Sequence, residues 1–320
     1  MTKTILPAFL SVQGYRLSDD EKRLFEQSNP LGVCLFAKSC NNVQNKEQLK
    51  SLCREIKETI GRNDVLIAID QEGGRVRRLT EPEFTPLTEQ AALLTPELAR
   101  IHAFLAAYDL KNCGININFA PVLDICYPFS SNVLQGRCFS GDEKNIAEQG
   151  KAMVDEYLAN GICPCIKHLP GHGRAKADPH LELPVIDDDF ETLRQDFYPF
   201  KKLSYAPMGM AAHLLLTKID SSNPSSESPI VIQKIIRQFI GFSGFLVSDA
   251  IVMQALKGSI VERAQRSLAA GCDAVCLGNA GYEANSELAA GKIAMSDKAL
   301  ERLQKISEII SKPLSVQSYE

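Results

Sequence analysis

The segment Ile162-Cys-Pro-Cys-Ile-Lys-His168 is a short apolar run that ends in two basic side chains. Seven other short apolar runs occur along the chain, with amphipathic stretches of helical periodicity between most of them. The eight runs cover residues 6–12, 32–36, 65–70, 115–123, 162–168, 209–215, 245–249 and 274–278. Runs that are apolar on both faces are typical of buried parallel strands joined by helical crossovers.

The amphipathic stretches predict the crossover helices, at residues 45–60, 89–111, 142–160, 190–205, 261–270 and 297–311. Eight strands alternating with helices predict an α/β fold of the (β/α)8 TIM-barrel type, formed as a single domain by residues 1–320. A doubly wound open sheet is the alternative. The serine-rich segment 221–228 is expected to be a surface loop and not a domain boundary.

Composition and charge exclude several classes of function. The chain is 45% hydrophobic and 23% charged, as in ordinary globular proteins. A net charge of -4 without a basic block argues against a nucleic-acid partner. No apolar stretch reaches the roughly 18 residues of a membrane-spanning helix, so no membrane partner is expected. Ten cysteines without framework spacing indicate free thiols and a cytoplasmic protein.

Polar side chains follow the ends of most predicted strands, and in a barrel these ends converge on one mouth. These residues are Asp70, Asp124, His168, His213, Asp249 and Asn279. Asp249 ends the run that begins at Phe245, where a carboxylate needs hydrogen bonds or a cation to compensate its burial. It is interpreted either as a nucleophile or general base, or as the N-cap of the next helix.

The stretch from Lys167 to His180 holds three of the five histidines and cannot form a regular helix or strand. Asp178 lies two residues before His180, so the carboxylate can orient the imidazole and stabilise its protonated form. The alternative is a solvated Asx turn ahead of Pro179. A metal site is disfavoured, because Pro170 and Gly171 break the helix that would place two histidines on one face.

The segment Asp70-Gln-Glu-Gly-Gly-Arg-Val-Arg-Arg78 combines acids, paired glycines and arginines. It lacks the spacing of a dinucleotide or phosphate-binding loop, so no cofactor is expected. The arginine donors suit hydroxyls, carbonyls and carboxylates, which indicates a clamp for a polar ligand. An exposed, salt-bridged loop is the alternative.

Five stretches together resemble the successive signatures of glycoside hydrolase family 3. They are Ile69-Asp-Gln-Glu-Gly-Gly-Arg-Val76, Asn118-Phe-Ala-Pro-Val-Leu-Asp124, Gly136-Arg-Cys-Phe-Ser-Gly-Asp142, Lys167-His-Leu-Pro-Gly-His-Gly173 and Val247-Ser-Asp-Ala250. They occur in the family's order from about residue 7 to residue 280. The chain is similar in particular to the β-N-acetylglucosaminidase branch, which includes single-domain bacterial enzymes of peptidoglycan recycling. Ala250 and Cys138 depart from the usual Asp and Ser.

The resemblance implies a retaining hydrolase that acts on terminal β-linked N-acetylglucosamine of muropeptides, without a metal or cofactor and as a monomer. Asp249 then matches the nucleophile, and His180 held by Asp178 matches the acid/base group. The matching contacts to the terminal sugar are Asp70, Arg78, Arg137, Lys167, His168 and His213. His172 is interpreted as a structural residue of the turn. A glycoside phosphorylase and a catalytically silent sugar-binding barrel are the alternatives.

Overall fold

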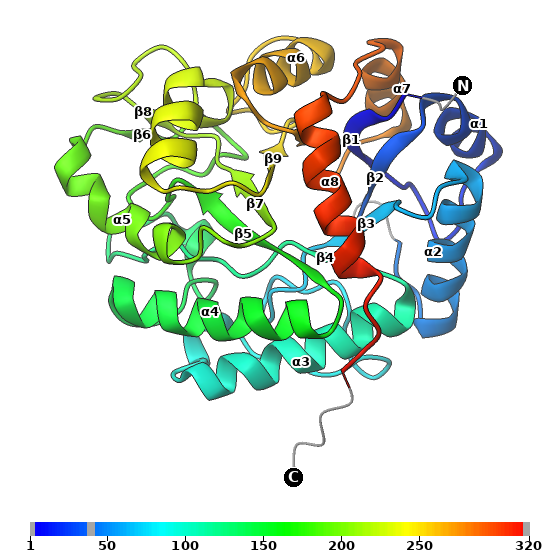
Figure 1. Ribbon diagram of the computed structural model, residues 1–320, viewed down its shortest axis with the longest axis horizontal. Helices are drawn as coiled ribbons and strands as arrows, with labels where there is room; N and C mark the ends of the chain where they lie inside the picture. Colours follow the sequence, from blue (N-terminus) through cyan, green and yellow to red (C-terminus); the bar gives the residue numbers. More distant parts are fainter. Residues whose placement is uncertain (1–3, 37–41, 316–320) are drawn as a thin grey trace.

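The computed structural model describes residues 4–36 and 42–315, and eight parallel strands of this part of the chain close into a barrel (Figure 1). Around the barrel the order is β1-β10-β9-β7-β5-β4-β3-β2. The strands are β1 (Leu6–Ser11), β2 (Pro30–Leu35), β3 (Leu66–Ile69), β4 (Ile117–Asn118), β5 (Cys163–Leu169), β7 (Met208–Ala211), β9 (Phe245–Ala250) and β10 (Ala274–Cys276). The predicted barrel is confirmed, and the open-sheet alternative is wrong because the sheet closes on itself.

Two predicted strands differ most from the expected bounds. The run 115–123 forms regular strand only as β4, because Pro121 has no N–H to donate to a neighbour. Beyond it, pairing with β5 continues as an isolated bridge between Val122 and Lys167. The run 209–215 divides: β7 ends at Ala211, and Leu215 begins a separate strand, β8 (Leu215–Leu216), which pairs with β6 (Val185–Ile186) outside the barrel.

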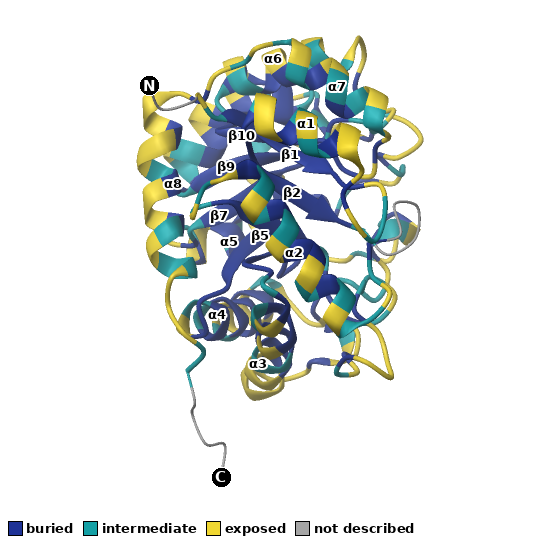
Figure 2. Ribbon diagram, turned by 90° about the vertical axis from the view of Figure 1, so that its right-hand side faces the viewer, coloured by how far each residue is buried: buried dark blue, intermediate teal, exposed yellow. Residues whose placement is uncertain are grey.

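Eight α-helices surround the strands in the described part of the chain, with their buried faces inward and exposed faces outward (Figure 2). They are α1 (Asp19–Ser28), α2 (Lys46–Ile60), α3 (Pro96–Cys113), α4 (Glu143–Ala159), α5 (Phe190–Lys202), α6 (Ile260–Ala270), α7 (Tyr282–Ala290) and α8 (Asp297–Ile310). A π-helical segment, Val231–Phe239, lies between β8 and β9.

The sequence did not predict three of these elements: α1, α7 and the π-helical segment. In α1 only Glu21 and Phe25 are buried, and in α7 only Asn285 and Leu288, so neither helix has a long apolar stripe. The predicted helix 89–111 begins only at Pro96, because Thr95 caps the amide of Leu98 and proline is favoured in the first turn.

Helix α8 packs on the end of the barrel where the strands begin. Its buried Leu303 and Ile306 belong to the same apolar cluster as Phe9 and Phe245 from the barrel interior. Arg302 Nη1 in this helix forms an ion pair of 2.6 Å with Oδ1 of Asp273, the residue just before β10. This end is therefore filled, and the carboxyl ends of the strands remain for a ligand. No helix in the described residues is long and apolar enough to cross a membrane.

Candidate active site

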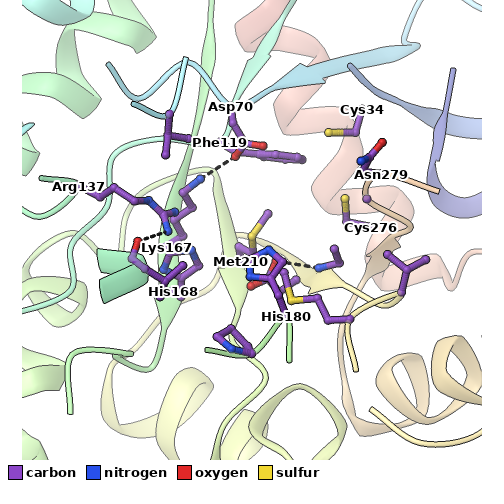
Figure 3. Close-up of a pocket in the computed structure, with 18 of the residues that line it drawn as sticks. Cys34, Asp70, Phe119, Arg137, Lys167, His168, His180, Met210, Cys276 and Asn279 are labelled. Carbon is purple, nitrogen blue, oxygen red and sulfur yellow. Dashed lines mark hydrogen bonds and ion pairs between the residues drawn. The ribbon is translucent and has the colours of Figure 1, made fainter. Parts of the chain in front are cut away.

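A cavity of about 510 Å³ opens at the carboxyl ends of the barrel strands (Figure 3). Side chains from β2, β5, β7, β9 and β10 and from the loops after β2, β3, β4, β5, β9 and β10 line it. The predicted site residues among them are Asp70, Arg78, Arg137, Lys167, His168, His180 and Asp249. The barrel therefore brings together predicted site residues that are up to 179 positions apart in the chain, Asp70 and Asp249.

One wall of the cavity is a network of buried ion pairs. Lys167 Nζ lies 2.8 Å from Asp70 Oδ1 and 2.6 Å from Glu72 Oε1. The Arg137 guanidinium makes two hydrogen bonds of 2.8 Å to the two oxygens of Glu72. On the outer side, Arg78 Nη2 lies 3.4 Å from Asp70 Oδ2. Three residues of the predicted clamp, Asp70, Glu72 and Arg78, therefore belong to a connected network of ion pairs, and the alternative of an exposed loop is wrong for them.

Charges inside the network fix its protonation. Burial alone would raise the pKa of Glu72, but the cations of Arg137 and Lys167 outweigh it and lower that pKa to about 2. Burial alone would lower the pKa of Lys167, but the carboxylates of Asp70 and Glu72 hold it above its usual value. Lys167 is therefore a cation and its partners are anions at neutral pH.

Local backbone geometry positions this wall. Gly73 and Gly74 both have positive φ, +105° and +54°, and turn the chain immediately after Glu72. The buried Gln71 then accepts hydrogen bonds from the amides of Arg78 and Leu79, at 2.8 and 3.0 Å. The turn thereby places Arg78 at the cavity and Glu72 behind the cavity lining, where Glu72 holds Arg137 and Lys167. Sequence reasoning missed Glu72, although its place two residues after Asp70 was a usable signal.

Asp124 follows β4 and anchors the start of the histidine-rich loop. Its fully buried carboxylate accepts a 2.7 Å hydrogen bond from His168 Nδ1 and one of 2.6 Å from the His172 amide. With Nδ1 donating, the Nε2 atom of a neutral His168 is left as an acceptor. Burial of Asp124 would raise its pKa, but His168 and His172 lower it. The carboxylate therefore stays ionised.

Asp249 lies in β9 with only 9% of its surface exposed. Its Oδ1 accepts a 2.7 Å hydrogen bond from the amide of Ala250. Burial would raise its pKa, but the interactions with His168 and His213 and the hydrogen bond from the Ala250 amide outweigh burial and lower it. The N-cap interpretation is wrong, because the following helix α6 is capped by Ser259. Asp249 is thus an ionised carboxylate at the cavity surface.

His213 does not line the cavity, in contrast to the other predicted sugar contacts. It is fully buried behind Asp249, with Nδ1 2.7 Å from Ser226 Oγ and Nε2 3.2 Å from the Ala250 carbonyl oxygen. Since Nε2 donates to that carbonyl, Nδ1 accepts from the serine hydroxyl. The expectation of a surface loop is confirmed for residues 221–224 but wrong for residues 225–228, which are buried and include the Ser226 that supports His213.

Asp178 and His180 lie in the loop after β5 and form a pair. His180 Nδ1 lies 2.7 Å from Asp178 Oδ1, which also accepts the His180 amide at 2.9 Å, so the Asx turn and the paired imidazole coexist. Burial would raise the pKa of Asp178, but these two hydrogen bonds lower it. The His180 side chain is 58% exposed and lines the cavity together with Pro179.

His172 is buried, and both of its ring nitrogens are without a hydrogen-bond partner in the described structure. Burial lowers its pKa to about 4, so the ring is neutral at pH 7. Its ring packs edge-on against His168, with centroids 5.8 Å apart. Among residues 4–36 and 42–315, no cluster of His, Cys, Asp or Glu side chains is arranged to hold a metal ion.

Known proteins share both this sequence and this fold. The family described as "Glycosyl hydrolase family 3 N terminal domain" matches residues 6–306. A beta-hexosaminidase of Bordetella avium is 32% identical over 321 residues, which cover 96% of this chain and 89% of that protein. The structure of NagZ from Neisseria gonorrhoeae in complex with N-trifluoroacetyl-D-glucosamine superimposes with a TM-score of 0.84 at 32% identity, covering 95% of this chain and 90% of that one.

A family 3 β-N-acetylglucosaminidase from a Paenibacillus species is also similar, with a TM-score of 0.87 and 28% identity. The match covers 98% of this chain but 64% of that one, so the present chain spans less than two thirds of that protein. The family match extends over nearly the whole barrel, from β1 into α8. The chain therefore belongs to glycosyl hydrolase family 3 and is a glycoside hydrolase.

Proposed function

We propose that this glycoside hydrolase is a retaining exo-β-N-acetylglucosaminidase. It removes terminal β-linked N-acetylglucosamine from muropeptides that end in anhydro-N-acetylmuramic acid. The observation that carries the proposal is one cavity that holds both the ionised Asp249 and a histidine paired with a carboxylate, His180 with Asp178. A nucleophile and a proton donor at one cavity are what a two-step displacement requires.

In the first step, a carboxylate oxygen of Asp249 attacks the anomeric carbon of the terminal sugar. His180, protonated on both nitrogens, donates the Nε2 proton to the glycosidic oxygen as the bond to the leaving sugar breaks. The Nδ1 proton stays on the ring and is donated in a hydrogen bond to Asp178 Oδ1, 2.7 Å away, and the negative charge of this carboxylate stabilises the imidazolium. The products are the leaving sugar, released with a free hydroxyl group, and a glycosyl ester of Asp249.

In the second step, the now neutral His180 accepts a proton from water at Nε2, and the water oxygen attacks the anomeric carbon. The ester bond to Asp249 breaks, so the configuration is retained after two inversions. The low pKa of Asp249 makes it a competent leaving group. His213 acts through Asp249: it fixes the strand carbonyl next to the nucleophile and does not contact the sugar.

The ion-pair wall is suited to a terminal sugar. Asp70 offers acceptor oxygens to hydroxyls, and Arg78, Arg137 and Lys167 offer donors at fixed positions. His168, which is held by Asp124 and also lines the cavity, adds a further polar contact. Because α8 fills the other end of the barrel, the cavity has a closed floor, which favours the end of a chain over an internal sugar. The Bordetella relative is named a beta-hexosaminidase and the Paenibacillus relative a beta-N-acetylglucosaminidase, which supports an N-acetylated hexosamine as the substrate.

The proposal places this activity in one catalytic domain, residues 1–320, acting as a monomer in the cytoplasm on recycled cell-wall fragments. Sedimentation at several protein concentrations tests the monomer. Release of N-acetylglucosamine from a disaccharide with anhydro-N-acetylmuramic acid, compared with release from chitobiose, tests the leaving group. We expect the muropeptide disaccharide to give the higher kcat/KM.

Trapping the intermediate tests the mechanism. A 5-fluoro or 2-fluoro derivative of the activated sugar is incubated with the protein, and the digest is analysed by mass spectrometry. We expect the added sugar on the peptide that contains Asp249, with Asp249→Asn unlabelled under the same conditions. Label on another carboxylate, such as Asp70, would exclude the assignment. Labelling of no peptide, with turnover intact, would exclude the covalent mechanism.

Assays of turnover distinguish two other activities. With inorganic phosphate in excess, a phosphorylase releases the sugar 1-phosphate, whereas a hydrolase releases the free sugar at an unchanged rate. We expect the free sugar. Absence of turnover of both an aryl N-acetylglucosaminide and the muropeptide disaccharide would identify a sugar-binding barrel instead.

A further inference from the structure

Exposed polar side chains from four loops surround the mouth of the catalytic cavity. Among the residues that line the cavity, the exposed ones are Arg75 after β3, His180 after β5, Gln254 after β9 and Asn279 after β10. Asp249 is buried, so the terminal sugar that it attacks lies deeper than these four side chains. The leaving group, whose oxygen is protonated by His180, therefore lies at the mouth.

Arg75 is held in place at this mouth by the backbone of the loop after β4. Its Nε atom donates to the carbonyl oxygen of Gln135 at 3.0 Å. Its Nη2 atom donates to the carbonyl oxygens of Asn132 and Val133, at 2.8 and 2.7 Å. These bonds use three of the five N–H groups of the guanidinium. Among residues 4–36 and 42–315, the two N–H groups on Nη1 have no hydrogen-bond partner.

Arg75 also differs from the other cations of the cavity lining in its charge balance. Each of the others forms an ion pair with a carboxylate of the cavity wall; they are Arg78, Arg137 and Lys167. Within the part of the chain that the structure describes, Arg75 forms no ion pair. An arginine side chain stays protonated in a protein. The mouth therefore carries a positive charge that is fixed in position and not neutralised by a carboxylate.

The barrel places this charge on the same side of the mouth as the proton donor. Strand β4 lies between β3 and β5, so the loops that carry Arg75 and His180 flank the loop after β4. Val133 and Leu134 of that middle loop also line the cavity. A leaving sugar next to His180 can therefore extend a substituent across these two residues to Arg75.

We propose that Arg75 binds a carboxylate of the leaving group and makes the enzyme select leaving sugars that are anionic. This inference rests on the proposed function, in which the leaving sugar is anhydro-N-acetylmuramic acid. That sugar carries a lactyl carboxyl group, and stem peptides attached to it carry further carboxylates. Nη1 of Arg75 donates to the carboxylate, in a hydrogen bond that the opposite charges strengthen. Arg75 thus determines specificity and does not contact the terminal sugar.

Two matched disaccharides test the selection. Both have N-acetylglucosamine β-linked to anhydro-N-acetylmuramic acid; one has the free lactyl carboxylate and the other its neutral N-methylamide. The glycosidic bond is the same in both, so the charge alone differs. We expect kcat/KM to be about threefold to fivefold higher for the acid at low ionic strength, as for an ion pair at an exposed site. The ratio should fall toward one in about 1 M NaCl, because salt screens such a pair.

Two variants separate the charge of Arg75 from its hold on the loop. Arg75→Gln and Arg75→Lys both weaken the bonds to the carbonyl oxygens and should lower kcat/KM for both disaccharides. Only Arg75→Lys keeps the charge, so it should retain a preference for the acid, whereas Arg75→Gln should have a ratio of about one. Arg77→Gln is the control, because Arg77 pairs with Glu81 and does not line the cavity. It should keep the wild-type ratio.

Three results in these assays would overturn the proposal. They are equal kcat/KM of the wild type for the two disaccharides, a preference for the acid that persists in Arg75→Gln, and equal ratios in Arg75→Lys and Arg75→Gln. The last result would leave Arg75 with a structural role in the loop after β4.

Binding measurements separate this inference from the proposed reaction. Titration calorimetry with Asp249→Asn gives the Kd of each disaccharide without turnover. We expect the acid to bind about threefold to fivefold more tightly than the amide, and the difference to vanish when Arg75→Gln is added. If the acid binds more tightly but the wild type cleaves neither disaccharide, the proposed reaction is wrong and the role of Arg75 is supported. Equal Kd values, or binding of neither, would overturn the role of Arg75.

Discussion

Asp124 accepts a 2.7 Å hydrogen bond from Nδ1 of His168, and its carboxylate has no exposed surface. The other oxygen accepts the amide of His172 at 2.6 Å. One buried side chain after β4 therefore sets the tautomer of a cavity histidine and holds the beginning of the loop that carries His180. Oδ2 therefore sets the His168 tautomer, and Oδ1 holds the loop at His172.

Asp124→Asn should lower both stability and activity. An amide has one acceptor oxygen, so its NH2 group must face either the His168 ring N–H or the His172 amide, both of which are donors. A buried donor left without an acceptor costs about 2 kcal/mol. We expect a loss of this size in the free energy of unfolding, measured with urea, and a fall in kcat/KM of at least about tenfold.

Asp142→Asn is the matched control for this substitution. Asp142 is exposed and caps α4 through the amides of Lys144 and Asn145, and asparagine caps helices equally well. It should leave both measurements within error of the wild type. Equal stability and activity of the Asp124 variant would show that the carboxylate does not hold the histidine.

Asp178→Asn should change the pH dependence of the reaction. The amide oxygen can still accept the His180 N–H groups, but the negative charge that stabilises the protonated ring is gone. The proton donor is then lost at lower pH, so the alkaline limb of the kcat/KM profile should move toward acid. The loss should be larger for the muropeptide disaccharide than for an activated aryl glycoside.

His180→Ala gives the limiting case, because its activity on the disaccharide should fall far more than its activity on the aryl glycoside. Asp189→Asn, at the exposed N-cap of α5, is the control for Asp178→Asn, because it removes the same negative charge outside the cavity. An unmoved alkaline limb in Asp178→Asn, or equal losses on the two substrates in His180→Ala, would remove the acid/base role from this pair.

The sequence was sufficient to predict the barrel and the side chains at the ends of its strands, because each lies at a recognisable change from apolar to polar residues. Asp249 and Lys167 are examples, one in β9 and one in β5. It was not sufficient for Glu72 or for the orientation of His213. Their positions depend on a glycine turn and on a buried serine from another loop, and neither leaves a periodic pattern in the chain.

Glu72→Gln should make the protein less stable at neutral pH and remove part of its sensitivity to acid. The pKa of Glu72 is about 2 in the folded protein, below its usual 4.5. This carboxylate therefore contributes its full stability above about pH 5, and the contribution is lost as the pH falls toward about 2. The difference between the two pKa values corresponds to about 3 kcal/mol.

Urea unfolding at several pH values between neutral and acid measures this effect. The free energy of unfolding of Glu72→Gln should lie about 3 kcal/mol below that of the wild type at pH 7, and the two curves should converge in acid. Glu191→Gln, an exposed partner of Arg194, should follow the wild type throughout. Parallel curves for Glu72→Gln and the wild type would contradict the ionised state of the buried network.

Gly73→Ala should damage the cavity wall because two effects act at this position. The residue has φ of +105°, and an added Cβ would lie 2.0 Å from the carbonyl oxygen of Thr88. Gly61, at the end of α2, has φ of +75° but nothing within 4 Å of an added Cβ. Gly61→Ala therefore reports conformational strain alone, which is about 1 kcal/mol.

We expect Gly73→Ala to lose about 2 kcal/mol more than Gly61→Ala in urea unfolding, since the backbone at Thr88 cannot move as a side chain would. Because Glu72 precedes this glycine and holds both Arg137 and Lys167, kcat/KM should also fall in Gly73→Ala. Gly61→Ala should retain wild-type kcat/KM. Equal stability losses in the two variants would mean that the close approach to Thr88 is relieved without cost. An unchanged kcat/KM in Gly73→Ala would mean that the turn does not set the position of the ion-pair wall.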